Sequence, residues 1–560
     1  MVSMFSALCA SAALLHTAYA ATVLPSNASM AITSGPVSPD GVERVAVLVN
    51  DEFPSPLIKA TKGDQFRLEV SDRLSPSEMI RENMDFATSI HWHGFFQRGT
   101  NYADGVAYVT QCPIMPGEKF TYRFADDDNK AGTYWYHSHF DLQYCDGLRG
   151  PLVVYDPEDP YQDDYDVDDE STVLTLADWY HTPARVQPGG PFFSDSTLIN
   201  GKGRSVKDFT APLANITVEQ GKRYRFRLIS LACEPNYVFS IDGHNMTIIE
   251  ADGQLTEPLT VNEIQIFPGQ RYSFILNATQ PSDNYWMRAV PSLALHGTNE
   301  TANFTGGLNS AILHYEGVSL DDPKTNSSQD RIPLREPDLR ALQDPAAPGT
   351  PEYGVDVQSV NLTMGFDGQY FLVNGRPFKG PTTGMPPYLL QILSGAQKAQ
   401  DLLPQESIVD IKRGSVVEVT ILPDMSGMAG APHPMHLHGH AFSVVRSAGS
   451  EEFNWENPVR RDVVSTGNTT EGPGAGAVIR FVADNPGPWF LHCHIDPHLQ
   501  GGLAVVFAEG VDAAAAANPP PADWAQLCPV WNTFFGSFNR PVDGPAANML
   551  QNATLDSDFD

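Results

Sequence analysis

Short runs in which polar and apolar residues alternate dominate the chain after its first twenty positions. Residues 119–124 (KFTYRF) and 223–228 (RYRFRL) are two examples. Strict alternation is typical of a strand with one buried face, because successive side chains of a strand point to opposite sides. The 45 glycines and 45 prolines interrupt these runs at short intervals, as the turns of β-sandwiches require. The pattern predicts an all-β fold.

A weak internal echo suggests that one β unit is repeated. Residues 116–122 (PGEKFTY) and 268–274 (PGQRYSF) share a turn followed by a strand, and 560 residues suffice for three sandwiches. The composition shifts at 156–170, rich in Asp, Tyr and Pro, and again at 317–354, rich in Pro, Asp and Asn. We therefore predict domains at 21–155, 156–325 and 355–530, a linker at 326–354 and a mobile surface tail at 531–560.

The first twenty residues have the features of a secretory signal peptide. Residues 1–15 are apolar and lack acidic side chains, and Ala18, Tyr19 and Ala20 fit a small-x-small cleavage site. A buried N-terminal helix is the alternative, since no Lys or Arg precedes the apolar run. Ten Asn-x-Ser/Thr sequons, among them Asn215, Asn277, Asn361 and Asn468, agree with secretion and glycosylation. A secreted glycoprotein is predicted.

The charge and hydropathy of the chain exclude two classes of partner. A formal net charge of -32 would repel nucleic acid and anionic membranes. No later segment approaches eighteen uninterrupted apolar residues, so a membrane span is not expected. We expect small-molecule partners and a monomer.

Six cysteines fall into three groups. Cys9 belongs to the signal peptide, and Cys493 stands between two histidines, where a metal ligand is expected. The other four are Cys112, Cys145, Cys233 and Cys528. Four cysteines in an oxidising compartment indicate two disulfides, with three possible connectivities.

Ten of the sixteen histidines lie in four compact clusters. The clusters are residues 91–93 (HWH), 137–139 (HSH), 433–438 (HPMHLH) and 492–498 (HCHIDPH). In a strand, residues i and i+2 point to the same face, so each H-x-H unit presents two imidazoles side by side. One such pair can be structural, but four pairs indicate metal binding.

The last cluster indicates which metal is bound. By the same period of two, Cys493 faces away from His492 and His494, so the thiolate and the imidazoles serve two different sites. Two histidines and one cysteine with a weak axial neighbour are typical of blue copper, and His433 and His498 can supply these imidazoles. Eight histidines then remain for three further metal ions. Zinc is the alternative, but it performs no redox chemistry and needs no sulfur joined to a neighbouring cluster.

Four strings resemble the copper motifs of multicopper oxidases, and in detail those of basidiomycete laccases. They are HWHGFFQRGTNYADG at 91–105, WYHSH at 135–139, HPMHLHGH at 433–440 and HCHIDPHLQGGLAVVF at 492–507. The resemblance extends from about Ala31 to Pro529 and includes QYCDGLRGP, INGKGR, GKRYRFRLISLACEPNY and DNPGPWFLHCH. It implies three cupredoxin-like Greek-key sandwiches or barrels, with a three-copper cluster between the first and the third.

The resemblance also implies a role for each ligand residue. His433, Cys493 and His498 would bind the type 1 copper, and His91 and His436 the type 2 copper. The type 3 pair would be bound by His93, His137, His139, His438, His492 and His494. The implied disulfides are Cys112–Cys528 and Cys145–Cys233. The remaining histidines after residue 20 match no ligand position and are predicted to be structural: His181, His244, His296, His314 and His440.

Further residues acquire expected roles from their positions in the motifs. Asp104 and Asp496 would relay protons or support ligands near the cluster. Leu503, ten residues after Cys493, would be the axial neighbour of type 1 copper without binding it. Glu234 would accept the phenolic proton, and Asn236, Ser292 and His498 would contribute to the substrate pocket. Pro497 replaces an aromatic residue often found beside the last ligand histidine. Because proline restricts the backbone, we expect the local conformation beside His498 to differ from the pattern of the family.

The predicted function is that of a laccase. The type 1 copper would take single electrons from phenolic or other aromatic molecules, such as benzenediols and lignin-derived phenols, and the cluster would reduce O2 to two water molecules. Three alternatives stay open: a ferroxidase, an ascorbate oxidase, and a blue-copper protein without catalysis. The last would leave eight histidines unexplained.

Overall fold

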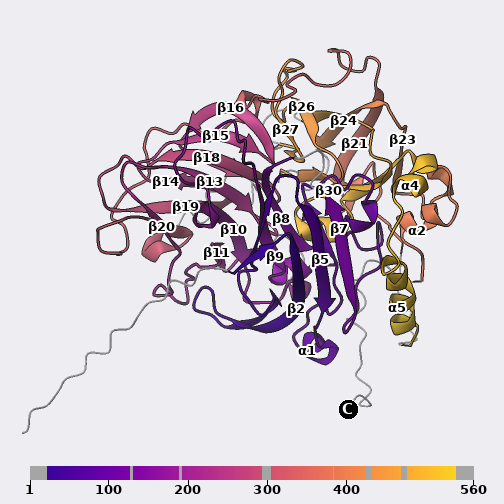
Figure 1. Cartoon of the computed structure of the whole chain (residues 1–560), viewed down its shortest axis with the longest axis horizontal. Coiled ribbons are helices and arrows are strands. Elements are labelled where there is room, and N and C mark those ends of the chain that lie inside the picture. Colours follow the sequence, from indigo (N-terminus) through magenta and orange to yellow (C-terminus); the bar gives the residue numbers. More distant parts are fainter. Residues whose placement is uncertain are drawn as a thin grey trace, which may run out of the picture.

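The computed structural model describes residues 22–125, 130–187, 192–292, 304–381, 384–423, 432–467 and 476–537. The predicted signal peptide, the Asn468 sequon and His296 lie outside these residues. Within them, six sheets form three two-sheet sandwiches that follow one another along the chain (Figure 1). The predicted all-β fold is confirmed.

The first sandwich contains the first two histidine pairs. Its five-stranded sheet has the order β1 (Val23–Pro25), β4 (Leu57–Thr61), β9 (Arg149–Tyr155), β8 (Gly132–Ser138) and β6 (Ile90–His93). Its four-stranded sheet has the order β3 (Arg44–Val49), β2 (Asn27–Val37), β5 (Gln65–Asp72) and β7 (Lys119–Ala125). In β7, Phe120, Tyr122 and Phe124 are buried while Lys119 and Arg123 reach solvent, as the alternation predicts, but Thr121, which should face outward, is buried as well.

The second sandwich contains no H-x-H pair. Its larger sheet has the order β11 (Ser196–Ile199), β10 (Val173–Trp179), β13 (Arg223–Ser230), β18 (Arg271–Asn277), β15 (Met246–Ala251) and β16 (Gln254–Val261). Its smaller sheet has the order β12 (Asn215–Val218), β20 (Ser310–Tyr315), β19 (Asn284–Ser292), β14 (Asn236–Ile241) and β17 (Ile264–Ile266).

Strand β13 corrects the alternation predicted for residues 223–228. Arg225 and Arg227 are buried, because Arg225 binds Glu250 (2.5 Å) and Arg227 binds Asp168 (2.7 Å). Arg227 also donates to Thr133 Oγ1 of the first sandwich (3.0 Å). This face of the strand is therefore a domain interface and not a solvated surface.

The third sandwich contains the last two histidine clusters. Its larger sheet has the order β22 (Phe371–Val373), β21 (Gln358–Phe366), β24 (Val416–Pro423), β29 (Ala477–Val482), β26 (Phe442–Arg446) and β27 (Arg460–Arg461). Its smaller sheet has the order β23 (Ile408–Ile411), β31 (Ala504–Glu509), β30 (Gly487–Cys493), β25 (Pro434–Leu437) and β28 (Val463–Ser465).

In the described ranges, five α-helices accompany the sheets: α1 (Pro76–Arg81), α2 (Tyr388–Leu393), α3 (Asp496–Gln500), α4 (Val511–Ala517) and α5 (Trp524–Ser537). Helix α5 packs on the first sandwich, beside which it lies in Figure 1, although it follows the third in sequence. Trp531 is only 1% exposed within that core. The prediction that a mobile surface tail begins at Trp531 is therefore wrong, because this aromatic ring is buried against the first domain. Residues 538–560 lie outside the described part of the chain.

Two disulfides join the first domain to distant segments. The Cys112–Cys528 disulfide connects it to α5, and Cys145–Cys233 connects it to the second domain. Both predicted pairings are confirmed, and Cys493 is the free cysteine among the described residues.

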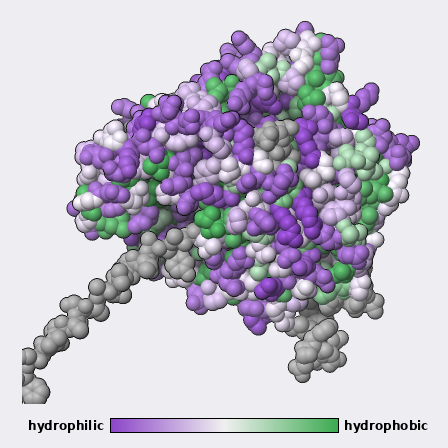
Figure 2. Space-filling view, viewed as in Figure 1, coloured by the Kyte–Doolittle hydropathy of each residue, from purple (hydrophilic) through white to green (hydrophobic). Residues whose placement is uncertain are grey.

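The visible surface is predominantly hydrophilic, with small scattered apolar areas (Figure 2). None of the described helices combines the length and the apolar character that crossing a membrane would require.

Candidate metal centre

Strand pairing places the histidine clusters in register within each domain. In the first domain β6 and β8 are antiparallel, with His91 opposite His137. In the third, β25 and β30 are antiparallel, with His436 opposite His492. The period-2 alternation holds: the rings of His91 and His93 are 5.7 Å apart, and those of His492 and His494 are 5.6 Å apart. Strand pairing thus places two H-x-H units next to each other in the first domain and two in the third.

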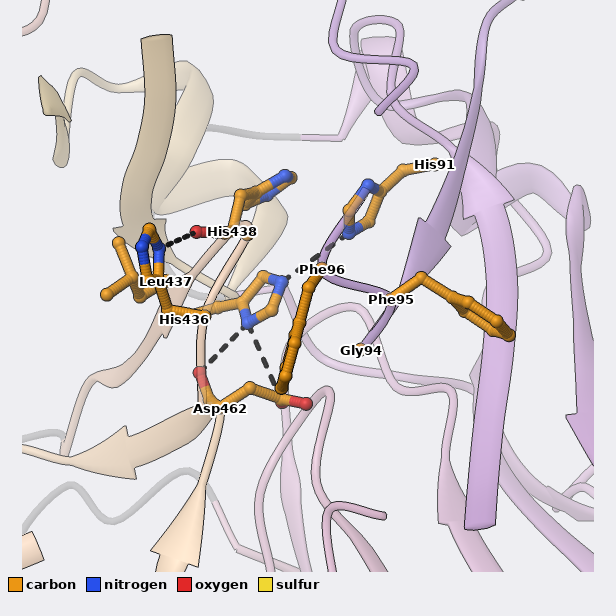
Figure 3. Close-up of a pocket in the computed structure, with 10 residues that line it drawn as sticks. His91, Gly94, Phe95, Phe96, His436, Leu437, His438 and Asp462 are labelled. Carbon is orange, nitrogen blue, oxygen red and sulfur yellow. Dashed lines mark hydrogen bonds and ion pairs between the residues drawn. The ribbon is translucent and has the colours of Figure 1, made fainter. Parts of the chain in front are cut away.

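The first and third domains bring these pairs face to face. His91 Nε2 lies 3.5 Å from His436 Nε2 across the domain boundary, as Figure 3 shows. His494 Nε2 lies 3.2 Å from His93 Nδ1, again between the two domains. A narrow pocket borders this contact and is lined by residues of both domains, including Phe96 and Asp462. Residues more than 300 positions apart therefore form one buried site.

The protonation of these imidazoles suits a metal. Burial, reinforced for most of them by neighbouring histidines, lowers the pKa of His93, His137, His139, His436, His438 and His494 well below the ordinary value. Burial also lowers the pKa of His492 to about 3. Neutral imidazoles with free lone pairs are the form that binds metal ions.

Hydrogen bonds on the outer side of the rings orient them inward. His91 Nδ1 donates to the Asp104 carbonyl (2.7 Å), His436 Nδ1 to the Asp462 carbonyl (2.9 Å) and His492 Nδ1 to the Cys493 carbonyl (2.9 Å). The other ring nitrogens, Nε2, then carry no proton and point toward one another. For example, His438 Nε2 and His492 Nε2 are 3.1 Å apart. Among the described residues, His137 Nε2 and His139 Nε2 have no hydrogen-bond partner. Such buried, unpaired acceptors fit metal ions.

A second site lies on the other side of β30. Cys493 Sγ lies 3.6 Å from His433 Nδ1 and 3.7 Å from His498 Nδ1, and these two nitrogens are 3.1 Å apart. The predicted separation of the thiolate from His492 and His494 is therefore present. The donor set of one thiolate and two imidazoles fits a copper site of the blue type.

Asp104 lies between two of the predicted ligands. Its carboxylate is fully buried, 3.0 Å from His438 Nδ1 and 3.3 Å from His91 Nδ1. One residue therefore orients imidazoles from both domains, on the side where the type 2 copper is predicted. Its part in proton transfer remains a prediction.

Asp496 occupies a different environment. Its backbone N–H donates to the Cys233 carbonyl (3.0 Å), and its carboxyl lies 3.6 Å from Cys145 Sγ, beside the interdomain disulfide. Burial, reinforced by the charge of Asp141, raises the pKa of Asp496 well above its ordinary value. Its carboxyl contacts the interdomain disulfide, and its role as a proton relay stays a prediction.

Glu234 lies next to the predicted type 1 ligand His498. Glu234 Oε1 is 3.9 Å from His498 Nε2, and Oε2 has no hydrogen-bond partner among the described residues. Burial, with a smaller effect of Asp178, raises the pKa of Glu234 to about 8. Asn236 donates to the Ser292 carbonyl (2.7 Å), which links β14 to β19. Substrate binding by Glu234, Asn236, Ser292 and His498 stays a prediction.

The loop after Cys493 shows how Leu503 and Pro497 are accommodated. The Leu503 carbonyl accepts from Cys493 N–H and its N–H donates to the His498 carbonyl, both at 3.0 Å, and its side chain is fully buried. Pro497 lies in the first turn of α3, where a missing N–H removes no helical hydrogen bond. Helix α3 therefore forms with proline beside His498.

Two residues that contact predicted ligands were not predicted from the sequence. Asp462 Oδ1 lies 3.2 Å from His93 Nε2, and the Phe371 ring packs 4.1 Å from the His498 ring. Asp462 directly follows Arg460 and Arg461 in a stretch with the pattern of a strand. Charged residues of both signs within a strand could have indicated a buried ion pair. Phe371 carries no comparable signal, because one aromatic residue in a strand is ordinary.

Four of the five histidines predicted to be structural lie in the described residues and have polar partners. His181 pairs with Asp40 (2.8 Å), His244 with Tyr315 (2.7 Å), His314 with Asn284 (2.7 Å) and His440 with Glu509 (3.0 Å).

Comparison with known proteins agrees with this geometry. Three models of the family described as multicopper oxidase match residues 31–159, 170–318 and 381–513. Laccase-4 of Trametes villosa is 53% identical over 535 residues, which cover 95% of this chain and 99% of the relative.

Two solved structures extend the comparison. The laccase of Botrytis aclada superimposes with a TM-score of 0.78 at 30% identity, covering 94% of this chain and 95% of that one. Fet3p, described as a multicopper oxidase that functions in iron import, superimposes with a TM-score of 0.75 at 25% identity, covering 94% and 98%.

Proposed function

The chain belongs to the multicopper oxidase family, and we propose that it acts as a laccase on phenolic and other aromatic substrates. Its cofactors are the four copper ions of that family: one of type 1, one of type 2 and two of type 3. His433, Cys493 and His498 would hold the type 1 ion. The eight histidines between the first and third domains would hold the other three.

The single observation that carries the proposal is the position of Cys493. Its side chain faces His433 and His498, while the residues on either side of it face the other cluster, where His492 meets His438 and His494 meets His93. One short stretch of backbone therefore joins a site suited to single electrons to a site with three ions.

Bound copper supplies one-electron oxidation at the first site and reduction of dioxygen at the second. Four phenols each lose one electron and one proton, and one dioxygen takes up four electrons and four protons to give two water molecules. The protein's part is to hold the two sites on one strand, to bury the imidazoles and to place carboxyl groups near both sites. Asp104 and Asp496 would pass protons toward the second site.

Glu234 would accept the phenolic proton, and His498 would face the substrate beside it. His498 Nε2 lies 3.9 Å from Glu234 Oε1, and a cation held by His498 would favour the carboxylate form of Glu234 and oppose the effect of burial on its pKa. Asn236 and Ser292 would line the same pocket. The proximity of Glu234 to a type 1 ligand supports phenols as the substrate class.

Replacement of Glu234 tests the proton acceptor. In Glu234→Ala we expect kcat/KM for 2,6-dimethoxyphenol to fall by at least about tenfold, since a positioned acid or base contributes about 10²–10⁴-fold. Oxidation of ferrocyanide, which releases no proton, should change little. Glu234→Gln, which keeps the shape of the side chain, should behave like the alanine variant. Equal losses on both donors would overturn the role.

Leu503→Met tests the axial position of the type 1 site. A thioether can donate a lone pair that leucine lacks, so the methionine should stabilise the oxidised ion and lower the type 1 potential. The potential is measured by redox titration of the blue band. Leu313→Met, a fully buried exchange in the second domain, is the matched control. An unchanged or raised potential in the Leu503 variant would contradict the assignment.

We further propose that the protein is a secreted, glycosylated monomer that binds neither nucleic acid nor membranes. The signal-like first twenty residues, the sequons and the net charge of -32 support this. Two of the three relatives named above are laccases, which also supports it.

The deciding experiment combines a copper count and a visible spectrum with oxygen uptake on 2,6-dimethoxyphenol and on ferrous iron. Four copper ions, a blue thiolate band and faster uptake with the phenol are expected. A marked preference for ferrous iron would indicate a ferroxidase instead. One blue copper ion without oxygen uptake would show that the protein is a copper carrier without catalytic activity.

A further inference from the structure

The second domain supplies none of the predicted ligands, yet one of its turns reaches the copper site. Residues 267–271 connect β17 to β18 and contain the PGQR sequence that echoes a turn of the first domain. Gly269 has φ +83°, and a Cβ atom there would lie 2.9 Å from His494 Cδ2 and 3.0 Å from His93 Cε1. The backbone of this turn therefore packs directly against two imidazoles, one from each ligand-bearing domain.

Arg271, at the end of the turn, joins all three domains. It is fully buried and donates from Nη1 and Nη2 to the two carboxylate oxygens of Asp462 in the third domain (2.6 and 2.8 Å). Its Nε donates to the Thr133 carbonyl of the first domain (3.0 Å). Such a bidentate pair fixes both the position and the plane of the carboxylate.

Asp462 in turn orients two predicted ligands. Its Oδ1 lies 3.2 Å from His93 Nε2, and its carbonyl accepts from His436 Nδ1 (Figure 3 shows the His436 contacts). A proton on His93 Nε2 leaves Nδ1 as the nitrogen free to bind metal, and Nδ1 is the atom that faces His494. The tautomer and the plane of His93 thus depend on a carboxylate that Arg271 holds.

We propose that the turn at 267–271 positions the three-copper cluster, with Arg271 as a positioning residue that acts through Asp462 on His93 and His436. The second domain then controls the retention of copper at a site to which it contributes no ligand. Gly94 of the first domain must also lack a side chain, because a Cβ atom there would lie 2.5 Å from Arg271 Nη2. The inference rests on the copper ligands of the proposed function, but not on the identity of the reducing substrate.

The test compares Arg271→Lys with Arg288→Lys in the full-length, copper-loaded protein. Lysine keeps the charge and loses the bidentate geometry. Arg288 makes an equivalent bidentate pair with Asp242 in the same domain (2.8 and 2.8 Å). It also contacts the Thr325 carbonyl and the Phe304 ring, and none of these residues is a predicted ligand. Copper is counted during titration with a chelator, and the type 2 signal is followed by electron paramagnetic resonance. The blue band of the type 1 site reports that the fold is intact.

In Arg271→Lys we expect copper of the cluster to be lost at about 10–100-fold lower chelator concentration, with an altered type 2 signal and an unchanged blue band. Arg288→Lys should resemble the parent protein. If Arg271→Lys does not accumulate, Asp462→Asn carries the test, because asparagine matches the size of aspartate.

Unchanged copper retention and an unchanged type 2 signal would overturn the proposal, as would equal losses in the two lysine variants. Failure of the laccase proposal is separate: the parent protein would then hold four copper ions and oxidise no phenol.

Discussion

Cys493→Ser should abolish phenol-driven oxygen uptake. The thiolate is the proposed sulfur ligand of the type 1 site, and from it the backbone leads directly to His492 and His494. Serine has nearly the same size but provides no thiolate, so the blue band should disappear. We expect the turnover rate to fall at least about 100-fold, because even partners one shell beyond the ligands contribute about 10–100-fold.

The same variant should keep the cluster on the other face of the strand. Copper counting should find three ions instead of four, and the type 2 signal should persist, since His492 and His494 are unchanged. A blue band or substantial uptake in Cys493→Ser would contradict the assignment of the type 1 site. Loss of all four ions would show that the two faces of β30 are not independent.

Trp531→Ala should destabilise the first domain by about 3–5 kcal/mol, the usual cost of removing a large buried aromatic side chain. Trp531 is 1% exposed, and its ring lies 5.8 Å from that of Tyr108 and 5.9 Å from that of Phe140. The midpoint of urea unfolding, followed by circular dichroism, measures the effect. The disulfide at Cys528 would still hold the helix near the domain, so the loss reports packing and not detachment.

Asn532→Ala is the matched control on the same helix. Asn532 is exposed, so its replacement should change the free energy of unfolding by no more than about 0.5 kcal/mol. Equal effects of the two replacements would mean that α5 does not contribute to the first-domain core.

Much of the copper chemistry could be predicted from the sequence, because it depends on neighbours along a strand. The period of two places His91 beside His93 and turns Cys493 away from His492 and His494, whatever the rest of the chain does. The alternating runs likewise predict sandwiches, and the pairing of His91 with His137 agrees with them. The disulfide partners could be named only through the resemblance to laccases, since four cysteines alone allow three pairings.

The alternation failed where strands meet another domain. Residues 223–228 have the pattern of a half-exposed strand, but Arg225 and Arg227 are buried because acidic partners from other segments neutralise them. The prediction of a mobile tail from Trp531 also failed because of a contact with another domain. Nothing near Trp531 in the sequence indicates that the first domain covers this side chain.

Strand geometry is local, so the amino-acid sequence is enough to predict which side chains bind copper and on which face of a strand each lies. The contacts between domains could be seen only in the folded molecule: Arg271 of the second domain holds Asp462 of the third, and Asp462 orients His93 of the first. These contacts join residues about 190 and 370 positions apart. They depend on how three separately formed sandwiches pack, and no periodicity in the chain records that packing.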